Sequence, residues 1–342
     1  MGPHDARADY AGLTPLAVLD ALQAVGLEGD GRLTQLNSFE NRVFQVMLVD
    51  GSVVVAKFYR PARWTDEQIA EEHRFSLEAA AAEVPVVAPL GLREAPEGSG
   101  VRLCPAAPGT LAEQTLETGR WRFAVWPRRA GRAPELEDPQ VLVRLGRCIA
   151  QLHTVGAQRR FDHRRTMDAL ADAQEACARI ESADCLPPDQ ADGWSRLCET
   201  ALGAIEARCR GIAPQLLRLH GDCHPGNLLW RDDRPNLVDL DDACTGPAIQ
   251  DLWMLLSGEP EAAAQQLDAL LLGYEQMRRF DRRELRLIEA LRLSRMLRHN
   301  AWLAQRWADP AFPAAYPDFG SSSYWAQQAM QLREQIAIAR ES

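Results

Sequence analysis

An aspartate that stands five residues before an asparagine is the feature that most constrains this chain. Asp222 and Asn227 lie in the loop His220–Asn227, with the sequence HGDCHPGN, and Asp239 follows a short apolar run. Asp222 can accept the proton of an attacking hydroxyl, while Asn227 and Asp239 can hold magnesium on the phosphates of a nucleotide. The spacing is therefore typical of phosphoryl transfer, with Asp222 and Asp239 as catalytic residues and with Asn227 and Asp239 as the metal ligands.

This loop also has two simpler interpretations. An isolated GDxxxxN could be a loop whose polar side chains only cap turns, but His220 before it and Leu228–Trp230 after it favour catalysis. His220 and His224 could bind zinc, yet no further His/Cys pair stands at ligand spacing. The eight cysteines are scattered without CxxC spacing, which indicates idle thiols in a reducing compartment.

The first third of the chain predicts a small antiparallel sheet with one packed helix. The runs Val43–Val49 and Val53–Phe58 flank Asp50-Gly51 and predict a β-hairpin. A capping box that begins at Thr65 opens a helix to about Ala82. Thr14-Pro15 opens an earlier helix, and residues 94–119 are expected to form a loop.

After Pro127 the pattern changes to long helices, expected at about 139–153, 166–182, 190–209, 261–279 and 282–306. One β-like patch, 228–240, interrupts them. We therefore expect an α+β, bilobal, protein-kinase-like fold. Its β-rich N-terminal lobe would span 1–127, with a hinge near 125–127, and its helical C-terminal lobe would span 128–342. A small ligand would bind in the cleft between the lobes.

Composition excludes several classes of partner. The 342 residues carry a net charge of −10, so nucleic-acid binding would need a strong local basic patch. Arg128-Arg129 and Arg159-Arg160 are short clusters that we interpret as solvated. Apolar segments fall short of the roughly 18 residues that span a bilayer, and the first residues do not resemble a secretory signal. We expect a cytoplasmic monomer that binds neither nucleic acid nor membranes.

The loop HGDCHPGN resembles the HGDxHxGN loop of aminoglycoside phosphotransferases, choline kinases and their relatives, which share the protein-kinase fold. Further blocks resemble the bacterial stress response kinase A group: residues 37–43, 57–61 with Trp64, 71–75, 240–243, 250–255 and 302–313. The resemblance covers the chain from about Leu13 to Trp325. The combination of blocks is specific, although no single block is.

This resemblance implies a serine/threonine-protein kinase of a bacterial stress response that uses ATP and Mg²⁺. Lys57 resembles the strand lysine that contacts the α- and β-phosphates. Val55 lies on the same side of its strand and is expected to cover the adenine. A carboxylate should hold Lys57, and spacing favours Glu72, with Glu71 left open as the second choice.

The other nucleotide contacts depart from the protein-kinase pattern. Leu36 to Arg42 contains no glycine, so Ser38 and Asn41 are expected to donate hydrogen bonds to the phosphates instead. Main-chain groups of Val125 and Trp126 at the hinge are expected to pair with the adenine edge, although Trp126 could equally belong to the core.

Two rival functions are also compatible with the sequence. A small-molecule kinase for an aminoglycoside, amino alcohol or sugar could use the same loop. Asp241, Asp242 and Asp251 could then line an acidic pocket, and the acidic chain slightly favours cationic substrates. A nucleotide-binding regulator without catalysis is the second rival, which the intact catalytic residues disfavour. The preferred function is transfer to a hydroxyl of an unidentified protein substrate, with autophosphorylation.

Overall fold

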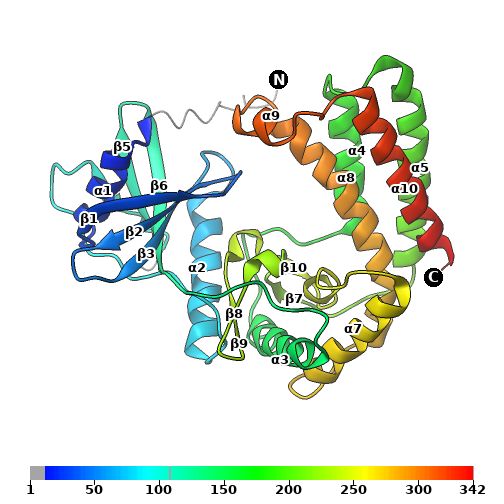
Figure 1. Ribbon diagram of the computed structural model, residues 1–342, viewed down its shortest axis with the longest axis horizontal. Coiled ribbons are helices and arrows are strands. Elements are labelled where there is room, and N and C mark those ends of the chain that lie inside the picture. The colour runs from blue at the N-terminus through cyan, green and yellow to red at the C-terminus, as the bar shows by residue number, and fades with distance from the viewer. Residues whose placement is uncertain (1–11, 108, 342) are drawn as a thin grey trace.

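The N-terminal part of the molecule is built around one antiparallel sheet (Figure 1). The computed structural model describes residues 12–107 and 109–341. The sheet has the order β1-β2-β3-β6-β5-β4, so β3, which carries Lys57, is a central strand. Its elements are α1 (Pro15–Ala24), β1 (Gly29–Leu36), β2 (Arg42–Leu48), β3 (Val53–Phe58), α2 (Asp66–Ala81), β4 (Val101–Leu103), β5 (Ala112–Leu116) and β6 (Gly119–Pro127).

Local chemistry fixes the hairpin and the second helix as the sequence predicts. Gly51 adopts a φ of 83° in the turn between β2 and β3, a conformation that glycine reaches without strain. Thr65 accepts a hydrogen bond from the backbone of Gln68, and the Gln68 side chain accepts one from the backbone of Thr65. The capping box and the β-hairpin are thus both confirmed.

The alternation of side chains along β3 separates the core from the ligand side. Val54, Ala56 and Phe58 are buried in the core of the sheet. Val55 and Lys57 point to the opposite face, because successive strand residues alternate. This sheet also contains strands that the sequence did not predict, namely β1, β4 and β5, the last two in the segment expected to be a loop.

The C-terminal part is mostly helical, which agrees with the expected α+β class. Its helices are α3 (Pro139–Gly156), α4 (Ala169–Ser182), α5 (Pro188–Cys209), α6 (Gln250–Trp253), α7 (Pro260–Tyr274), α8 (Ile288–Arg306), α9 (Ala311–Ala315) and α10 (Ser322–Glu341). Its short strands are β7 (Leu216–Leu219), β8 (Leu228–Arg231), β9 (Arg234–Leu237) and β10 (Cys244–Pro247), in the pairs β7–β10 and β8–β9.

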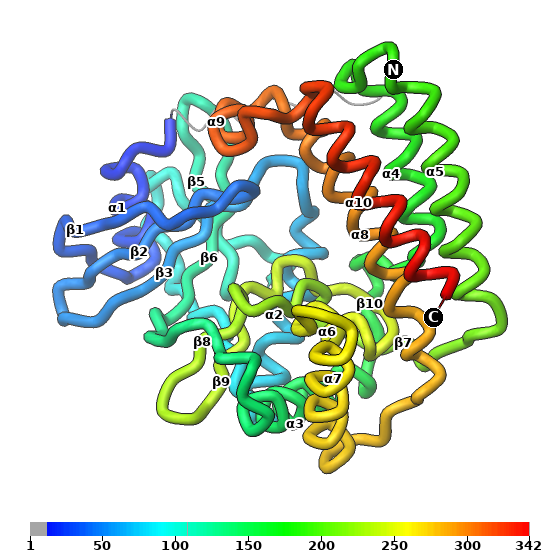
Figure 2. Tube along the Cα trace, turned by 45° about the vertical axis from the view of Figure 1, so that its right-hand side comes forward, coloured from blue at the N-terminus to red at the C-terminus, as the bar shows by residue number. Residues whose placement is uncertain are grey.

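Helices α4, α5, α8 and α10 lie side by side in both views and form one arm of the C-terminal part (Figures 1 and 2). Their facing side chains make one buried cluster, in which Trp194 and Trp325 pack at 4.7 Å between ring centroids. A second cluster joins α3 and α7 to the short strands. None of the helices in the described ranges is long and apolar enough to cross a membrane.

Two glycines allow α3 and α7 to touch backbone to backbone. A Cβ on Gly146 would lie 2.0 Å from the carbonyl oxygen of Leu270, and one on Gly273 would lie 1.9 Å from that of Val143. Neither backbone can yield without separating the helices, so any side chain at these positions should strain the packing.

We expect Gly273→Ala to lower the free energy of unfolding by about 1–3 kcal/mol, the usual cost of overpacking. Gly203→Ala is the matched control, because a Cβ on Gly203 in α5 meets no atom within 4 Å. That change should stabilise the protein by about 0.4–1 kcal/mol. Thermal unfolding of both variants tests the contact, and equal melting temperatures would contradict it.

Candidate active site

The loop that carries Asp222 is held in place by a buried carboxylate. Asp251, which is fully buried, accepts hydrogen bonds from the backbone N–H groups of His220 at 2.8 Å and Gly221 at 2.9 Å. His153 makes a third contact with it at 3.0 Å. Gly221 has a φ of 83°, and a Cβ there would lie 2.2 Å from the carbonyl oxygen of Asp242. Only glycine therefore fits this turn.

The pairing of β8 with β9 brings the two expected metal ligands to one end of a hairpin. The backbone N–H of Val238 donates to the carbonyl of Asn227 at 3.1 Å, and Asp239 is the next residue. The Asn227 amide nitrogen donates to the carbonyl of Asp222 at 3.0 Å, which leaves its amide oxygen for a cation. His220 joins the loops through Val238 at 2.9 Å and so has a structural role.

These two residues fit a magnesium ion carried by a nucleotide. Both offer oxygen atoms, and the Asp239 side chain is 49% exposed. In the part of the chain that the structure describes, no group of three or more His, Cys, Asp or Glu side chains is arranged to hold a metal. Magnesium usually takes one or two protein ligands and completes its shell with phosphate and water, so a small set of ligands is sufficient here.

Asp239 holds the amine of Lys57. Its backbone is left-handed, with φ 59° and ψ 64°, a conformation that non-glycine residues adopt mainly at turns and functional sites. The Lys57 ammonium lies 2.5 Å from Asp239 and 3.9 Å from Asp241. Burial opposes the charge of Lys57, but these carboxylates hold its pKa above the ordinary value. Lys57 is therefore a fixed cation beside the expected metal site.

The expected ion pair between Lys57 and Glu72 is replaced by the pair with Asp239. Glu72 is fully buried, and burial raises its pKa to about 7. One of its oxygens accepts a hydrogen bond from Ser76 at 3.1 Å. The second choice, Glu71, faces away from Lys57, because its carboxylate accepts the backbone N–H groups of residues 162–164 at 2.6–3.0 Å. Glu72 is thus the glutamate whose charge acts on Lys57.

Asp222 lies between two basic side chains. The guanidinium of Arg295, from α8, lies 2.9 Å from one of its oxygens, and Nε2 of His224 lies 3.5 Å from the other. Burial would raise the pKa of Asp222, but the contact with His224 and the charge of Arg295 hold that pKa well below its usual range. Asp222 is consequently ionised at neutral pH and can accept a proton.

The segment expected to contact phosphates is anchored to other parts of the protein. The side chain of Asn41 donates to Asp241 at 3.2 Å and accepts from the backbone of Arg60 at 3.1 Å. These contacts use one of the two N–H donors of its amide, and the expected phosphate contact of Asn41 stays a prediction. The Ser38 hydroxyl accepts a hydrogen bond from the Asn41 backbone at 3.3 Å and keeps its own proton for a ligand.

The tip of the same segment is bound to the C-terminal helices. Glu40 contacts Arg306 at 3.1 Å and also accepts a hydrogen bond from Trp302, both on α8. Phe39 packs against Phe312 of α9 at 5.8 Å between ring centroids. Residues distant in the sequence therefore hold the segment before β2 against α8 and α9.

Val125 and Trp126, the residues expected at the hinge, lie at the end of β6 beside β3. Val55 pairs with Trp126 and lies on the face of Lys57. The Trp126 ring lies 5.0 Å from the Lys57 ammonium, so it packs beside the site. The carbonyl of Val125 already accepts a hydrogen bond from the backbone of Leu90 at 2.7 Å. The expected pairing of main-chain groups of Val125 and Trp126 with the adenine edge stays a prediction.

The sequence did not predict the arginines Arg63, Arg164 and Arg295 in the site, and it offered Asp241 only as a candidate acid for the substrate. Asp241 is buried and pairs with Arg63 at 2.5 Å, while Arg164 donates to its backbone carbonyl at 2.5 Å. Asp241 follows Asp239 by two residues, and this proximity could have indicated that it belongs to the site. Arg295 has no motif, and only the structure brings it to Asp222.

The comparisons with known proteins agree with this geometry. A model described as the phosphotransferase enzyme family matches residues 32–288. The chain is similar to serine/threonine protein kinase RdoA of Salmonella typhimurium strain LT2, with 39% identity over 338 residues that cover 99% of this chain and 97% of that protein. It is also similar to stress response kinase A of Escherichia coli strain K12, with 38% identity over 329 residues, which are 96% of this chain and 94% of that protein.

Among solved structures, the fold is similar to that of amicoumacin kinase hAmiN in complex with AMP-PNP, Ca²⁺ and Ami. The TM-score is 0.69 and the sequence identity is 18%, over 94% of this chain and 93% of that chain. The resemblance noted from the HGDCHPGN loop and the expected kinase-like fold are thus confirmed.

Proposed function

The chain belongs to the phosphotransferase enzyme family, and within that family we propose that it transfers the γ-phosphate of ATP to serine and threonine hydroxyls of a protein. It is an ATP-dependent phosphotransferase that uses a divalent cation. The finer proposals are the protein substrate, a role in stress response, autophosphorylation and magnesium as the cation. The cytoplasmic and monomeric state expected from the sequence stays a prediction.

The contacts support one assignment of roles. The acceptor oxygen attacks the γ-phosphorus, the bond from that phosphorus to the bridging oxygen breaks, and ADP leaves with the electron pair. Asp222 takes the hydroxyl proton, for which it must be ionised. Asn227 and Asp239 would hold magnesium, which neutralises charge on the phosphates when it is bound. Lys57 supplies a fixed positive charge for the α- and β-phosphates, and Val55 covers the adenine.

One observation carries the choice of a protein substrate. The three acids that could have lined a pocket for a polycation all serve contacts within the protein. Asp241 and Asp242 pair with Arg63 at 2.5 and 2.8 Å, and Asp251 holds the backbone of the catalytic loop. A desolvated aminoglycoside needs acids of its own to pair with. The name of the Salmonella typhimurium relative, a serine/threonine protein kinase, supports the same choice.

The test is a phosphate-transfer assay with purified protein and labelled ATP. We expect phosphoserine and phosphothreonine, by mass spectrometry, on the protein itself and in a library of serine- and threonine-containing peptides. Aminoglycosides and amino alcohols should remain unmodified in parallel reactions. Modification of a small molecule without any phosphorylated polypeptide would establish the small-molecule rival, and nucleotide binding without any transfer would establish the inactive regulator.

A further inference from the structure

Helix α8 carries a basic face that the phosphate-transfer chemistry does not require. Arg292, Arg295, His299, Trp302 and Arg306 follow one another at spacings of three and four residues, so they lie along one side of the helix. The helix contains four arginines and only one acid, Glu289. Its local charge is therefore opposite to the net charge of −10 on the chain.

This face connects the two ends of the catalytic site. Arg295 contacts Asp222 at 2.9 Å, and Trp302 and Arg306 contact Glu40 in the segment before β2. The rise from residue 295 to residue 302 is roughly 10 Å along the helix. In Figure 2 the helix runs diagonally alongside α4 and α10. A substrate that presents a hydroxyl to Asp222 therefore meets this face of α8.

The charge at Arg295 is placed where a substrate can reach it. Its side chain is 47% exposed, although it lies against Asp222. Burial, and after it the neighbouring charge of Arg295, lowers the pKa of His299. Arg292 is held in position over the ring of Trp253 at 5.7 Å. A carboxylate on the substrate would gain an ion pair with the half-exposed guanidinium of Arg295.

We infer that the acceptor serine or threonine lies in an acidic segment of the protein substrate, and that Arg295 is the specificity-determining residue that recognises a neighbouring aspartate or glutamate. The inference rests on the proposed protein kinase function and names its substrate class. An acidic neighbour also has a chemical advantage. It can pair with the guanidinium while Asp222 turns one oxygen to the acceptor hydroxyl.

The experiment compares peptide libraries with one serine and flanking glutamate, glutamine or lysine. For the wild type, we expect kcat/KM to be roughly 5- to 20-fold higher with glutamate than with glutamine, and lowest with lysine. The preference should weaken as salt is raised, since screening reduces the attraction of partly exposed charges. A wild type without preference, or with preference for lysine, would overturn the inference while leaving the protein kinase function intact.

Variants of α8 test whether its arginines cause the preference for acidic peptides. Arg295→Gln should reduce the ratio between acidic and neutral peptides to less than about twofold, while Arg295→Lys should keep most of it. Because Arg295 contacts Asp222, Arg292→Gln provides a second variant that does not contact the base. It should reduce the same ratio in part, even if Arg295→Gln proves inactive. If Arg295→Gln is active and its ratio of kcat/KM between acidic and neutral peptides is unchanged, another residue recognises the acidic side chain.

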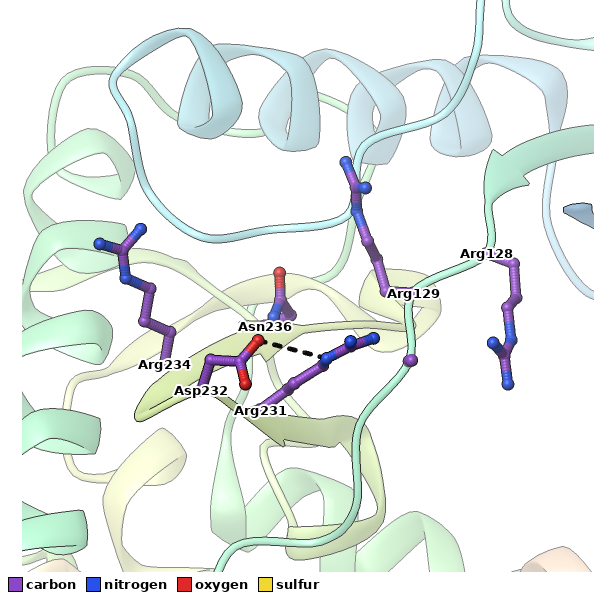
Figure 3. A pocket seen from close by; sticks show the side chains of 7 residues that line it. Arg128, Arg129, Arg231, Asp232, Arg234 and Asn236 are labelled. Atoms are coloured by element: carbon purple, nitrogen blue, oxygen red, sulfur yellow. Dashed lines mark ion pairs between the residues drawn. The ribbon is translucent and has the colours of Figure 1, made fainter. Parts of the chain in front are cut away.

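A second arginine cluster provides the matched control. Arg128, Arg129, Arg231 and Arg234 line a cavity of about 570 Å³ between the hinge and the β8–β9 hairpin (Figure 3). None of the residues predicted for the active site lines it. Arg234→Gln removes the same charge as Arg295→Gln and should leave the acidic preference at its wild-type value. Loss of the preference in Arg234→Gln would move substrate recognition to the cavity and contradict the role of α8.

Failure of every peptide, with transfer to an amino alcohol instead, would reject the proposed function itself.

Discussion

Asp222→Asn is expected to lower kcat by roughly 10²–10⁴-fold, the usual contribution of a positioned base, which corresponds to about 3–5 kcal/mol of barrier. Asparagine has nearly the same shape but cannot accept the hydroxyl proton. The affinity for magnesium–ATP should remain close to that of the wild type, because Asp222 contacts Arg295 and His224 and the nucleotide is expected at Lys57 and Asp239. Single-turnover transfer and nucleotide binding, measured separately, distinguish the two effects.

Asp233→Asn is the matched control for Asp222→Asn. Asp233 lies in the turn between β8 and β9, and its side chain is 78% exposed. The control should transfer phosphate at the wild-type rate, which excludes a general effect of losing one carboxylate. Wild-type kcat in Asp222→Asn at saturating nucleotide would show that Asp222 is not the base, and a large loss of nucleotide affinity would give it a binding role instead.

The parts of the site that could be predicted from sequence are those built from neighbouring residues. Asp222 and Asn227 lie in one loop, and a single hydrogen bond across β8 and β9 brings Asp239 next to them. The capping box at Thr65 is likewise complete within four residues. In each case the contact depends on local backbone geometry, which the residue types already specify.

The partner of Lys57 could not be predicted in this way. Asp239 is 182 positions away from Lys57 in the chain, and several buried acids compete for the same amine. Spacing within α2 favoured Glu72, but the choice depends on how the sheet and the metal loop approach each other. Asn41 shows the same limit, because its amide contacts Asp241, 200 positions away.

Missed elements were those with weak sequence patterns. β1 has only two of its eight residues partly buried and the rest exposed, so no apolar alternation marks it. β7 and β10 have four residues each and are too short for a periodic signal. The basic face of α8 was visible as arginines at helical spacing, yet only the contact between Arg295 and Asp222 relates it to the catalytic loop.

Asp239→Asn is expected to raise the magnesium concentration required for activity by more than roughly 100-fold. Loss of a residue that only supports a metal ligand already lowers metal affinity by up to about 100-fold, and loss of a ligand itself should cost more. The Asp239 carboxylate is half exposed, and the strand pairing places it directly after the residue bonded to Asn227. Asparagine tolerates the left-handed conformation of residue 239, so the change removes the charge and keeps the turn. Lys57 should stay ordered in the variant, because Asp241 lies 3.9 Å from its ammonium.

The measurement is a magnesium titration at fixed ATP, followed both by phosphate transfer and by the binding of a fluorescent nucleotide. Asp233→Asn again serves as the control, because Asp233 is also an aspartate with a positive φ, 59°. In Asp239→Asn, nucleotide binding should lose its dependence on magnesium, while binding without metal should improve or remain equal, since one negative charge near the phosphates is gone. If nucleotide binding instead weakens equally with and without magnesium, Asp239 acts through Lys57 rather than through the metal. An unchanged magnesium requirement would remove Asp239 from the metal site and leave Asn227 as the remaining candidate ligand.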